Sequence, residues 1–474
     1  MNPRSLGGAL AILVLVFSNL TIGQVERSEL GKRLRRFELA WQTAPVELQQ
    51  KSATPMQAAV TSFFSLQLAG AAKQLDGAWR VVRNEPPGTA ESAVTAFRIH
   101  TEKQIVEPES AVITTQLQAF YQTKAVVPAN CQVEFEIKKT SGEILSVKEL
   151  PWSEALDPVE LRIENLPAGD YLLAAQINVD GKVVELLPTG FSRINELTRR
   201  LAELEKIARD PDSELTAVVR ATLRDQVDLL RSMNEGDVQE TDYPAAQILT
   251  LGESLVADIA NGSSLIAVAA KQHDVWLTLA NERKRVPVRV RMPESHAEKM
   301  PVLFLMHGAG GSENMFFETY GAGGAVTSGL KRGWLVVAPR QSLGGLRLDC
   351  SEMLDSLESI FPIDRSRVLL LGHSMGAGQV IRQAVLHPEL PCGVAAIGGG
   401  GGIKDAARIA DIPWFIAAGE LDFGRRGAVA LHRSLKTAGA SRNIYQEYPG
   451  VEHLVIVQAA LEDTFKFFDS ILDR

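Results

Sequence analysis

Ser374 is the residue whose surroundings most clearly predict chemistry in this chain of 474 residues. It lies in Gly372-His373-Ser374-Met375-Gly376, a G-x-S-x-G pattern between the apolar run 368–371 and a segment with helical spacing. Glycines on both sides leave room for a sharp turn that exposes the serine hydroxyl above a sheet. The N-terminus of the following helix favours negative charge beside that hydroxyl. This context predicts a serine nucleophile.

A serine hydroxyl is a weak nucleophile until a base takes its proton, so a histidine and an acid are needed as partners. His453 follows the expected strand 443–448 and is the candidate base. Two acids, Glu420 and Asp422, follow the preceding expected strand. Ser374, His453 and one of these acids would form a nucleophile, base and acid set suited to acyl transfer.

The elements that position these residues alternate in the second half of the chain. Apolar runs, separated by segments with helical spacing, occupy 302–306, 334–338, 368–371, 393–397 and 414–418. Strands that are apolar throughout are typical of a parallel sheet covered on both faces. Independently of the motifs, the pattern predicts an α/β domain with a mostly parallel sheet over residues 271–474.

From Val302 to Arg474 the chain resembles exported serine esterases of the α/β-hydrolase superfamily, particularly the polyhydroxybutyrate-depolymerase and feruloyl-esterase-like group and the related dienelactone hydrolases. Four features carry the resemblance: the G-x-S-x-G turn, the segment 362–368 before it, the chain order serine, acid, histidine, and His307-Gly308-Ala309-Gly310-Gly311 after the first central strand. The motifs are specific for the superfamily and its chemistry and do not specify a substrate.

The resemblance assigns roles to individual residues. It implies that Asp422, at the family's G-x-x-D position, is the acid in preference to Glu420. It also implies that the backbone N–H groups of Ala309 and Met375 form an oxyanion hole, with Gly310 as the alternative to Ala309 if the loop is displaced by one residue. His307 is expected to have a structural role.

The implied reaction is hydrolysis of a small-molecule or polymeric carboxylic ester through an acyl-enzyme, with Ser374, Asp422 and His453 as the catalytic residues. Two alternatives stay open. A serine peptidase related to prolyl oligopeptidase would use the same triad and also carry an N-terminal domain, although the first half of this chain lacks a blade repeat. The other alternative is a binding protein with a vestigial hydrolase domain.

The first half of the chain changes its hydrophobic period twice. Residues 24–90 and 193–270 have helical spacing, whereas 91–192 alternate with a period of two. The segment Leu166-Pro167-Ala168-Gly169-Asp170-Tyr171 resembles the turn of immunoglobulin-like modules. We therefore predict two helical segments on either side of an immunoglobulin-like β-sandwich.

The helical and sandwich units are candidates for a lid. Only about fifteen residues separate Ile397 from Pro413, where many relatives insert a cap. We therefore expect the preceding units to dock over Ser374. Within the first helical region, Pro45 and Pro55 are expected to separate helices, with one helical segment over 56–75.

Composition and charge limit the partners. A content of 45% hydrophobic and 22% charged residues is typical of globular proteins, and a net charge of -8 without long basic runs disfavours nucleic acid. Arg4 precedes the apolar run 6–17, which is shorter than the ~20 residues of a spanning helix, and Gly23 follows. Residues 1–23 are therefore predicted to be a cleaved signal peptide, which implies a secreted or periplasmic protein without a stable membrane span. An uncleaved N-terminal anchor is the alternative.

Cysteine usage gives no sign of a disulfide framework or a metal site. Cys131, Cys350 and Cys392 have no paired spacing, and no histidine has a second ligand at metal-binding distance in the sequence. No cofactor and no metal are expected, and the oligomeric state stays open.

Overall fold

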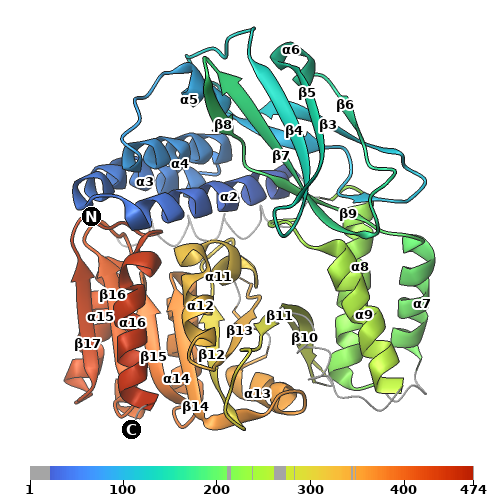
Figure 1. Cartoon of the computed structure of the whole chain (residues 1–474). Coiled ribbons are helices and arrows are strands. Elements are labelled where there is room, and N and C mark those ends of the chain that lie inside the picture. Colours follow the sequence, from blue (N-terminus) through green and yellow to red (C-terminus); the bar gives the residue numbers. More distant parts are fainter. Residues whose placement is uncertain are drawn as a thin grey trace.

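The computed structural model describes residues 22–210, 215–237, 239–260, 274–281, 283–342, 345–346 and 348–472. N-terminal helices are followed by a β-sandwich, a second group of helices and a C-terminal α/β domain (Figure 1). The predicted signal peptide lies outside the described residues except for Ile22 and Gly23, which begin the first described helix.

Three N-terminal helices share one core: α2 (Ile22–Thr43), α3 (Val46–Phe64) and α4 (Leu68–Val82). The short α5 (Ala90–Val94) follows them and packs in the core of the sandwich. The expected single segment over 56–75 is wrong, because α3 ends at Phe64 and the chain turns through Leu66, whose φ is 59°. Pro55 lies inside α3 and does not separate two helices.

A buried ionic cluster joins α2 to α4 and to the sandwich. The carboxylate of Asp76 accepts hydrogen bonds from Arg33 Nε at 3.2 Å, Arg36 Nη2 at 2.6 Å and the hydroxyl of Tyr121 at 2.6 Å. Asp76 is fully buried and Arg33 is 1% exposed, so removing one partner would leave a buried charge uncompensated. This cluster fixes the position of α2.

The β-sandwich has two sheets around one core, as the period of two predicts. One sheet has the order β1 (Phe97–Thr101), β3 (Val112–Ala119), β6 (Val159–Arg162). The other has the order β2 (Ile105–Val106), β9 (Thr189–Arg193), β7 (Gly169–Val179), β4 (Gln132–Lys139), β5 (Ile144–Pro151), with β8 (Lys182–Glu185) paired to β7 and α6 (Trp152–Ala155) after β5. The Tyr171 hydroxyl donates to Pro167 O at 2.7 Å, which resembles the tyrosine corner of immunoglobulin-like domains.

The second helical group comprises α7 (Leu197–Arg209), α8 (Ala217–Asn234) and α9 (Ala245–Ala260). Asp170 of β7 accepts hydrogen bonds from the Ala246 and Gln247 N–H groups, both at 2.9 Å. The sandwich thus supplies the acceptor for N–H groups in the first turn of α9 that have no partner within the helix. The helices share one core with the first strands of the α/β domain. They therefore support the edge of its sheet.

The α/β domain contains an eight-stranded sheet. Its spatial order is β10 (Val275–Ala280), β11 (Arg285–Arg291), β13 (Leu335–Pro339), β12 (Met300–Met306), β14 (Ile363–His373), β15 (Pro391–Ile397), β16 (Trp414–Gly419), β17 (Asn443–Tyr448). The pairs β10–β11 and β11–β13 are antiparallel and the remaining pairs are parallel. The prediction of a mostly parallel sheet is confirmed.

Helices cover both faces of this sheet. Successive strand residues point to opposite sides, so the apolar strands place hydrophobic side chains on both faces, and both must be buried. On β12, Val302 and Phe304 pack in one core with α13 (Cys350–Glu358), α14 (Met375–Leu386) and α15 (Arg425–Thr437). Leu303 and Leu305 pack in the other core with helices on the opposite face. These are α11 (Met315–Glu318), α12 (Gly324–Leu330) and α16 (Ile456–Leu472); the 3₁₀ turns are η1 (Tyr320–Gly323) and η2 (Ala406–Ile409).

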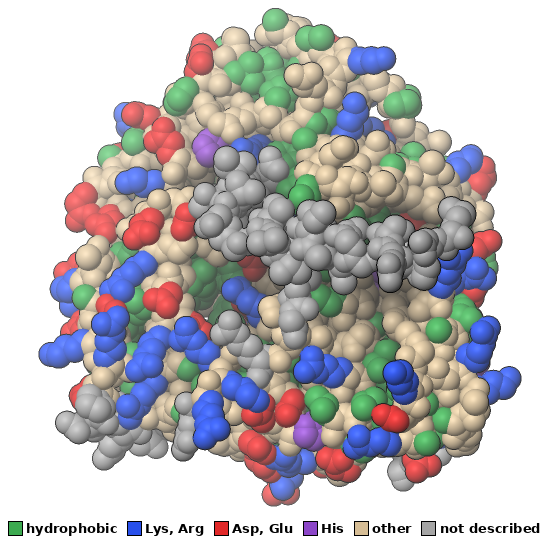
Figure 2. All heavy atoms as spheres, turned by 180° about the vertical axis from the view of Figure 1, so that it is seen from behind, with side chains coloured by type: hydrophobic (Ala, Val, Ile, Leu, Met, Phe, Trp, Pro, Cys, Tyr) green, Lys and Arg blue, Asp and Glu red, His purple; other side chains and the backbone are tan. Residues whose placement is uncertain are grey.

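The N-terminal helices lie across one end of the α/β domain, with the sandwich beyond them (Figure 1). The contacts described below place this layer at the carboxyl ends of the parallel strands. On the face seen in Figure 2, the coloured acidic and basic side chains are interspersed, so no large field of one sign gathers there.

Candidate active site

Ser374 occupies a strained turn between β14 and α14. Its φ is 57° and its ψ is -114°, a conformation that non-glycine residues rarely adopt and that persists only when the surroundings enforce it. A Cβ on Gly372 would lie 2.2 Å from Gly376 O, and one on Gly376 would lie 1.9 Å from Met306 O. Both glycines of the G-x-S-x-G pattern are therefore required by close backbone approaches.

The structure brings Ser374, His453 and Asp422 together. His453 Nε2 lies 3.0 Å from Ser374 Oγ, and His453 Nδ1 lies 2.7 Å from Asp422 Oδ1. Asp422 follows the end of β16, and His453 lies between β17 and α16. With the acid on one nitrogen and the serine on the other, the imidazole can take the serine proton while the carboxylate holds the ring.

Asp422 is held as a carboxylate. Burial raises the pKa of Asp422, but the hydrogen bond and charge of His453 and the N–H of Gly424, 2.6 Å from Oδ1, outweigh burial and lower the pKa below its usual value. The rival acid, Glu420, is exposed, and its Oε2 accepts the N–H of Gly450 at 3.0 Å. Asp422, and not Glu420, contacts the histidine.

The predicted oxyanion loop lies beside Ser374. The N–H groups of Ala309 and Met375 form none of the loop hydrogen bonds among the described residues, and Met375 is the first residue of α14, where helix N–H groups are free. The N–H of Gly308 is used, because it donates to the Tyr320 hydroxyl at 3.2 Å. The N–H of Gly310, the alternative donor, forms none of these hydrogen bonds either, so the loop N–H groups of Ala309 and Gly310 both stay candidates for binding an oxyanion together with that of Met375.

The two other histidines near Ser374 are structural. His307 Nε2 accepts the N–H of Gln341 at 3.1 Å, so Nδ1 carries the proton and donates to Gly308 O at 2.7 Å. Burial lowers the pKa of His307 to about 4 and that of His373 to about 3. His373 Nε2 donates to His453 O at 2.9 Å and so fixes the backbone of the base.

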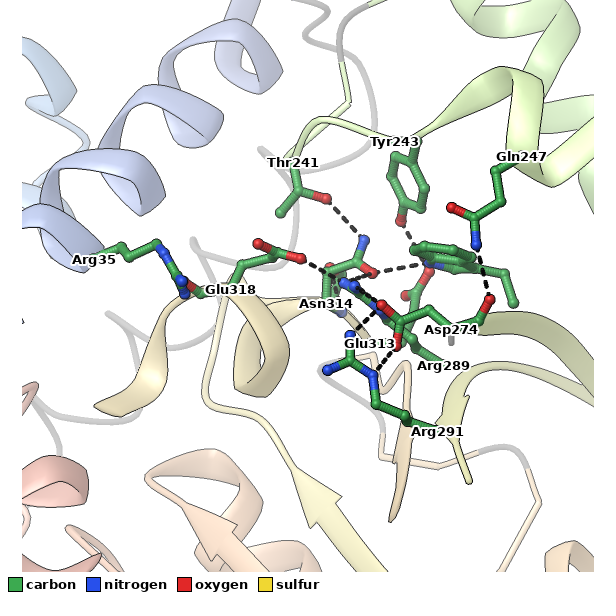
Figure 3. Close-up of polar contacts among 12 residues, drawn as sticks. Arg35, Thr241, Tyr243, Gln247, Asp274, Arg289, Arg291, Glu313, Asn314 and Glu318 are labelled. Atoms are coloured by element: carbon green, nitrogen blue, oxygen red, sulfur yellow. Dashed lines mark hydrogen bonds and ion pairs between the residues drawn. The ribbon is translucent and has the colours of Figure 1, made fainter. Parts of the chain in front are cut away.

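A buried polar cluster holds the segment that follows the oxyanion loop (Figure 3). Asn314 Oδ1 accepts from Trp276 Nε1 at 3.0 Å and from Arg289 Nη1 at 3.1 Å, while Asn314 Nδ2 donates to Thr241 Oγ1 at 2.8 Å. Trp276 and Arg289 come from the β10–β11 edge, and Thr241 precedes α9. The segment is therefore tied to three separate parts of the chain.

Ion pairs extend this cluster on both sides. Glu313 pairs with Arg340 at 2.6 Å and accepts the Tyr243 hydroxyl at 2.8 Å. Burial raises the pKa of Glu313, but Arg340 outweighs burial and lowers the pKa below its usual value. Arg289 bridges Asp274 and Glu318, each at 2.7 Å (Figure 3). Buried networks of this kind restrict the motion of a loop, which an oxyanion site requires.

A cavity of about 110 Å³ opens above Ser374. Its floor is formed by Ser374, His453 and the oxyanion loop, and its walls come from the N-terminal helices. The apolar wall residues include Leu30, Leu34, Val60, Phe63, Leu75 and Met315. The helices dock over the nucleophile as expected, whereas the sandwich contributes no described lining residue, so the expectation that it does so is wrong.

Polar contacts attach this helical roof to the α/β domain. Arg35 Nη1 donates to Glu318 O at 2.8 Å (Figure 3), and Gln57 Nε2 donates to Leu421 O at 3.2 Å. The buried carboxylate of Glu38 accepts the N–H groups of Gly321 at 3.2 Å and Ala322 at 3.0 Å. Burial, together with the charge of Glu452, raises the pKa of Glu38 to about 8 despite these donors.

Three residues that contact the site were not predicted from the sequence. Phe423 packs its ring against His453, Phe63 lies over Gly310, and Arg27 lines the cavity. Phe423 had a signal, since it directly follows the predicted acid. Arg27 and Phe63 had none, because helical spacing in the first region does not indicate which distant loop a side chain will meet.

Among the described residues, no group of three or more His, Cys, Asp or Glu side chains could hold a metal ion. No helix among them has both the length and the apolar composition to cross a membrane.

No family model matches this sequence, and no curated protein sequence matches it significantly. Similar solved structures include a ferulic acid esterase, with 18% identity over 42% of this chain and 97% of that chain and a TM-score of 0.36. An S-formylglutathione hydrolase from Agrobacterium tumefaciens has 16% identity over 42% and 95%, with a TM-score of 0.35. A thermostable esterase has 15% identity over 79% and 99%, with a TM-score of 0.39.

These likenesses are too weak to define the fold by themselves. The strand order, the strained turn at Ser374 and the loop at 307–311 define it from the chain's own structure. The C-terminal part of the chain has the α/β-hydrolase fold, as predicted, preceded by helices and a small β-sandwich.

Proposed function

We propose that this protein is a serine hydrolase that cleaves carboxylic esters through an acyl-enzyme. The observation that carries the proposal is the pair of contacts made by His453, at 3.0 Å to Ser374 Oγ and 2.7 Å to Asp422 Oδ1. A hydroxyl, a base and a buried acid in this order are the parts that acyl transfer needs.

In the first half of the reaction, Ser374 Oγ attacks the ester carbonyl while His453 Nε2 takes the hydroxyl proton. Asp422 stabilises the imidazolium that forms, and it remains ionised because its pKa lies below its usual value. The N–H groups of Ala309 and Met375 bind the oxyanion of the tetrahedral intermediate. One such donor lowers the barrier by about 3 kcal/mol.

The first intermediate collapses as the bond between the acyl carbon and the alcohol oxygen breaks, His453 returns the proton to the leaving alcohol, and the Ser374 acyl-enzyme remains. A water molecule then attacks the acyl carbon, with His453 as base, and the second tetrahedral intermediate releases the acid and restores Ser374. The same machinery cleaves amides, so peptide hydrolysis is the second candidate that the experiment must separate.

The test compares Ser374→Ala with wild type and with Ser359→Ala, which replaces the exposed serine directly after α13. We expect Ser374→Ala to lower kcat on 4-nitrophenyl butyrate by about 10³-fold or more and to abolish labelling by a fluorophosphonate probe. Ser359→Ala should behave as wild type. Labelling that persists in Ser374→Ala contradicts the proposed nucleophile.

A panel of aminoacyl-4-nitroanilides beside the ester separates the two reactions. We expect ester turnover in wild type and little anilide turnover. A higher kcat/KM on the anilides would favour the peptidase. Absence of both activities and of probe labelling would favour the binding protein with a vestigial hydrolase domain.

We also propose export through the segment 1–23. Helix α2 begins at Ile22, so cleavage near Gly23 would leave almost all of this roof helix in place. N-terminal sequencing of the protein from the outside of expressing cells tests this proposal. An intact N-terminus in a cytoplasmic fraction contradicts it.

A further inference from the structure

The roof of the cavity combines an apolar wall with one cation. Leu30 and Leu34 of α2 and Phe63 of α3 present apolar side chains above Ser374. Arg27, one turn before Leu30 on α2, lines the same cavity and is partly buried. A substrate that fills this space would therefore meet hydrocarbon and one guanidinium group.

Arg27 lies against the oxyanion loop. Its Nη1 atom is 3.9 Å from the position that a Cβ on Gly310 would occupy, and Phe63 Cζ is 3.0 Å from the same position. Gly310 follows Ala309, whose N–H is proposed to bind the oxyanion. The guanidinium group is thus close to the place where the ester carbonyl would bind.

The charge of Arg27 has no partner within the described chain. Lys32, Arg33 and Arg36 of the same helix each form an ion pair with a carboxylate. Arg27 forms neither an ion pair nor a side-chain hydrogen bond with any described residue. Because a guanidinium group does not lose its proton in proteins, a full positive charge faces the cavity.

The carboxylate of the cavity contacts a different cation. Glu240 is the one acidic side chain among the described lining residues, and it lies 3.4 Å from Arg340. Arg340 pairs with Glu313 as well. No carboxylate among the described residues is therefore paired with Arg27, which leaves its guanidinium group available to an anionic ligand.

We propose that Arg27 binds a carboxylate on the substrate, so that the preferred substrates are esters with an apolar body and an anionic group near the scissile bond, such as half-esters of dicarboxylic acids. The inference rests on the proposed ester hydrolysis at Ser374. A guanidinium group matches a carboxylate in planar, bidentate geometry. Such a contact would orient the ester carbonyl toward the oxyanion hole before the attack.

The experiment uses matched pairs of activated esters with one leaving group. The 4-nitrophenyl half-esters of succinic, glutaric and adipic acid are compared with 4-nitrophenyl esters whose acyl chains carry an ethyl group in place of the carboxylate. We expect wild type to prefer the best half-ester over its neutral partner by about tenfold or more in kcat/KM.

Arg27→Gln should lower kcat/KM on that half-ester by about 10- to 100-fold. The loss on the neutral ester should be much smaller, so that the ratio of the two kcat/KM values falls by about tenfold. Arg27→Lys keeps the charge without the bidentate geometry and should have an intermediate effect. Lys73→Gln removes the same charge from an exposed position on α4 and should behave as wild type.

The outcomes distinguish the inference from the proposed function. Equal losses on both esters in Arg27→Gln, or a wild type that does not prefer the half-ester, overturn the role of Arg27 and leave ester hydrolysis intact. A wild type that hydrolyses neither ester contradicts the proposed function itself, and the inference falls with it.

Discussion

The ring of Phe423 lies over the imidazole of His453, with the centroids 3.9 Å apart and the planes inclined by 36°. Phe423 also makes an edge contact with Phe64 of α3, at 5.6 Å between centroids. Although it is 59% exposed, Phe423 thus links the proposed base to the helical roof. An aromatic face beside an imidazole stabilises the cation that forms during the reaction.

Phe423→Ala is expected to lower kcat by about 2- to 10-fold, because one aromatic contact is worth about 0.5–1.5 kcal/mol. The free energy of unfolding should change little, since substitutions of exposed residues usually shift it by within ~0.5 kcal/mol. Steady-state kinetics on 4-nitrophenyl butyrate and thermal unfolding measure both effects. Phe423→Tyr retains the ring and is the control; an unchanged kcat in Phe423→Ala would show that the stacking has no kinetic role.

Asp422→Asn is expected to lower kcat by about 10³- to 10⁴-fold, because the amide cannot hold the same tautomer or stabilise the imidazolium. Glu420→Gln removes a charge two residues earlier, and its kcat should stay within about twofold of that of wild type. The carboxylate of Glu420 accepts the Gly450 N–H and does not contact His453. The kcat values of both variants, with circular dichroism as a check of folding, decide between the two acids. A larger loss in Glu420→Gln would reverse the assignment.

Gly376→Ala is expected to destabilise the protein severely, because the added Cβ would lie 1.9 Å from Met306 O. A clash with fixed backbone belongs among the substitutions that cost more than about 4 kcal/mol. Gly378→Ala is the matched control, since a Cβ there meets nothing within 4 Å and alanine favours the helix by about 1 kcal/mol. Soluble yield and thermal unfolding test the pair; equal stabilities would show that the turn can relax.

Glu38 should make stability depend on pH. Its pKa is raised from 4.5 to about 8 in the folded protein, so between these values the folded state holds a proton that the unfolded state has lost. The free energy of unfolding contributed by this group is then present below pH 4.5 and is lost as pH rises to about 8.

Glu38→Gln removes this titration, so its melting temperature relative to wild type should increase between pH 5 and pH 8. Thermal unfolding of both proteins at several pH values in this range provides the measurement. A constant difference between them would mean that Glu38 is ionised in the folded protein throughout.

The α/β domain and the positions of Ser374, Asp422 and His453 followed from the sequence because they depend on local patterns. Ser374 and Asp422 follow apolar strands within three residues, His453 follows the strand 443–448 within five, and parallel strands end at one edge of a sheet. The side chains therefore had to meet there once the strands paired. The role of the turn glycines could also be predicted, because it depends only on the five residues of the G-x-S-x-G motif.

Only part of the helical roof could be predicted from the sequence. The helical spacing over residues 24–90 predicted helices, but it did not indicate that Arg27 and Phe63 would lie against Gly310, which is far away in the chain. Pro55 predicted a helix boundary, but the structure has none there. The proline is tolerated inside α3 because the neighbouring Met56 and Ala59 are packed in the core of the N-terminal helices. Tertiary contacts of this kind override local propensity.

Arg27 and His453 line one cavity but are far apart in the sequence. The ribosome therefore synthesises the Arg27 side of the cavity long before the His453 side. At ~5–20 residues per second, several tens of seconds pass between them. A chain whose translation stops before residue 453 has the roof helices without the proposed base. Hydrolysis at Ser374 should therefore begin only after synthesis has passed His453.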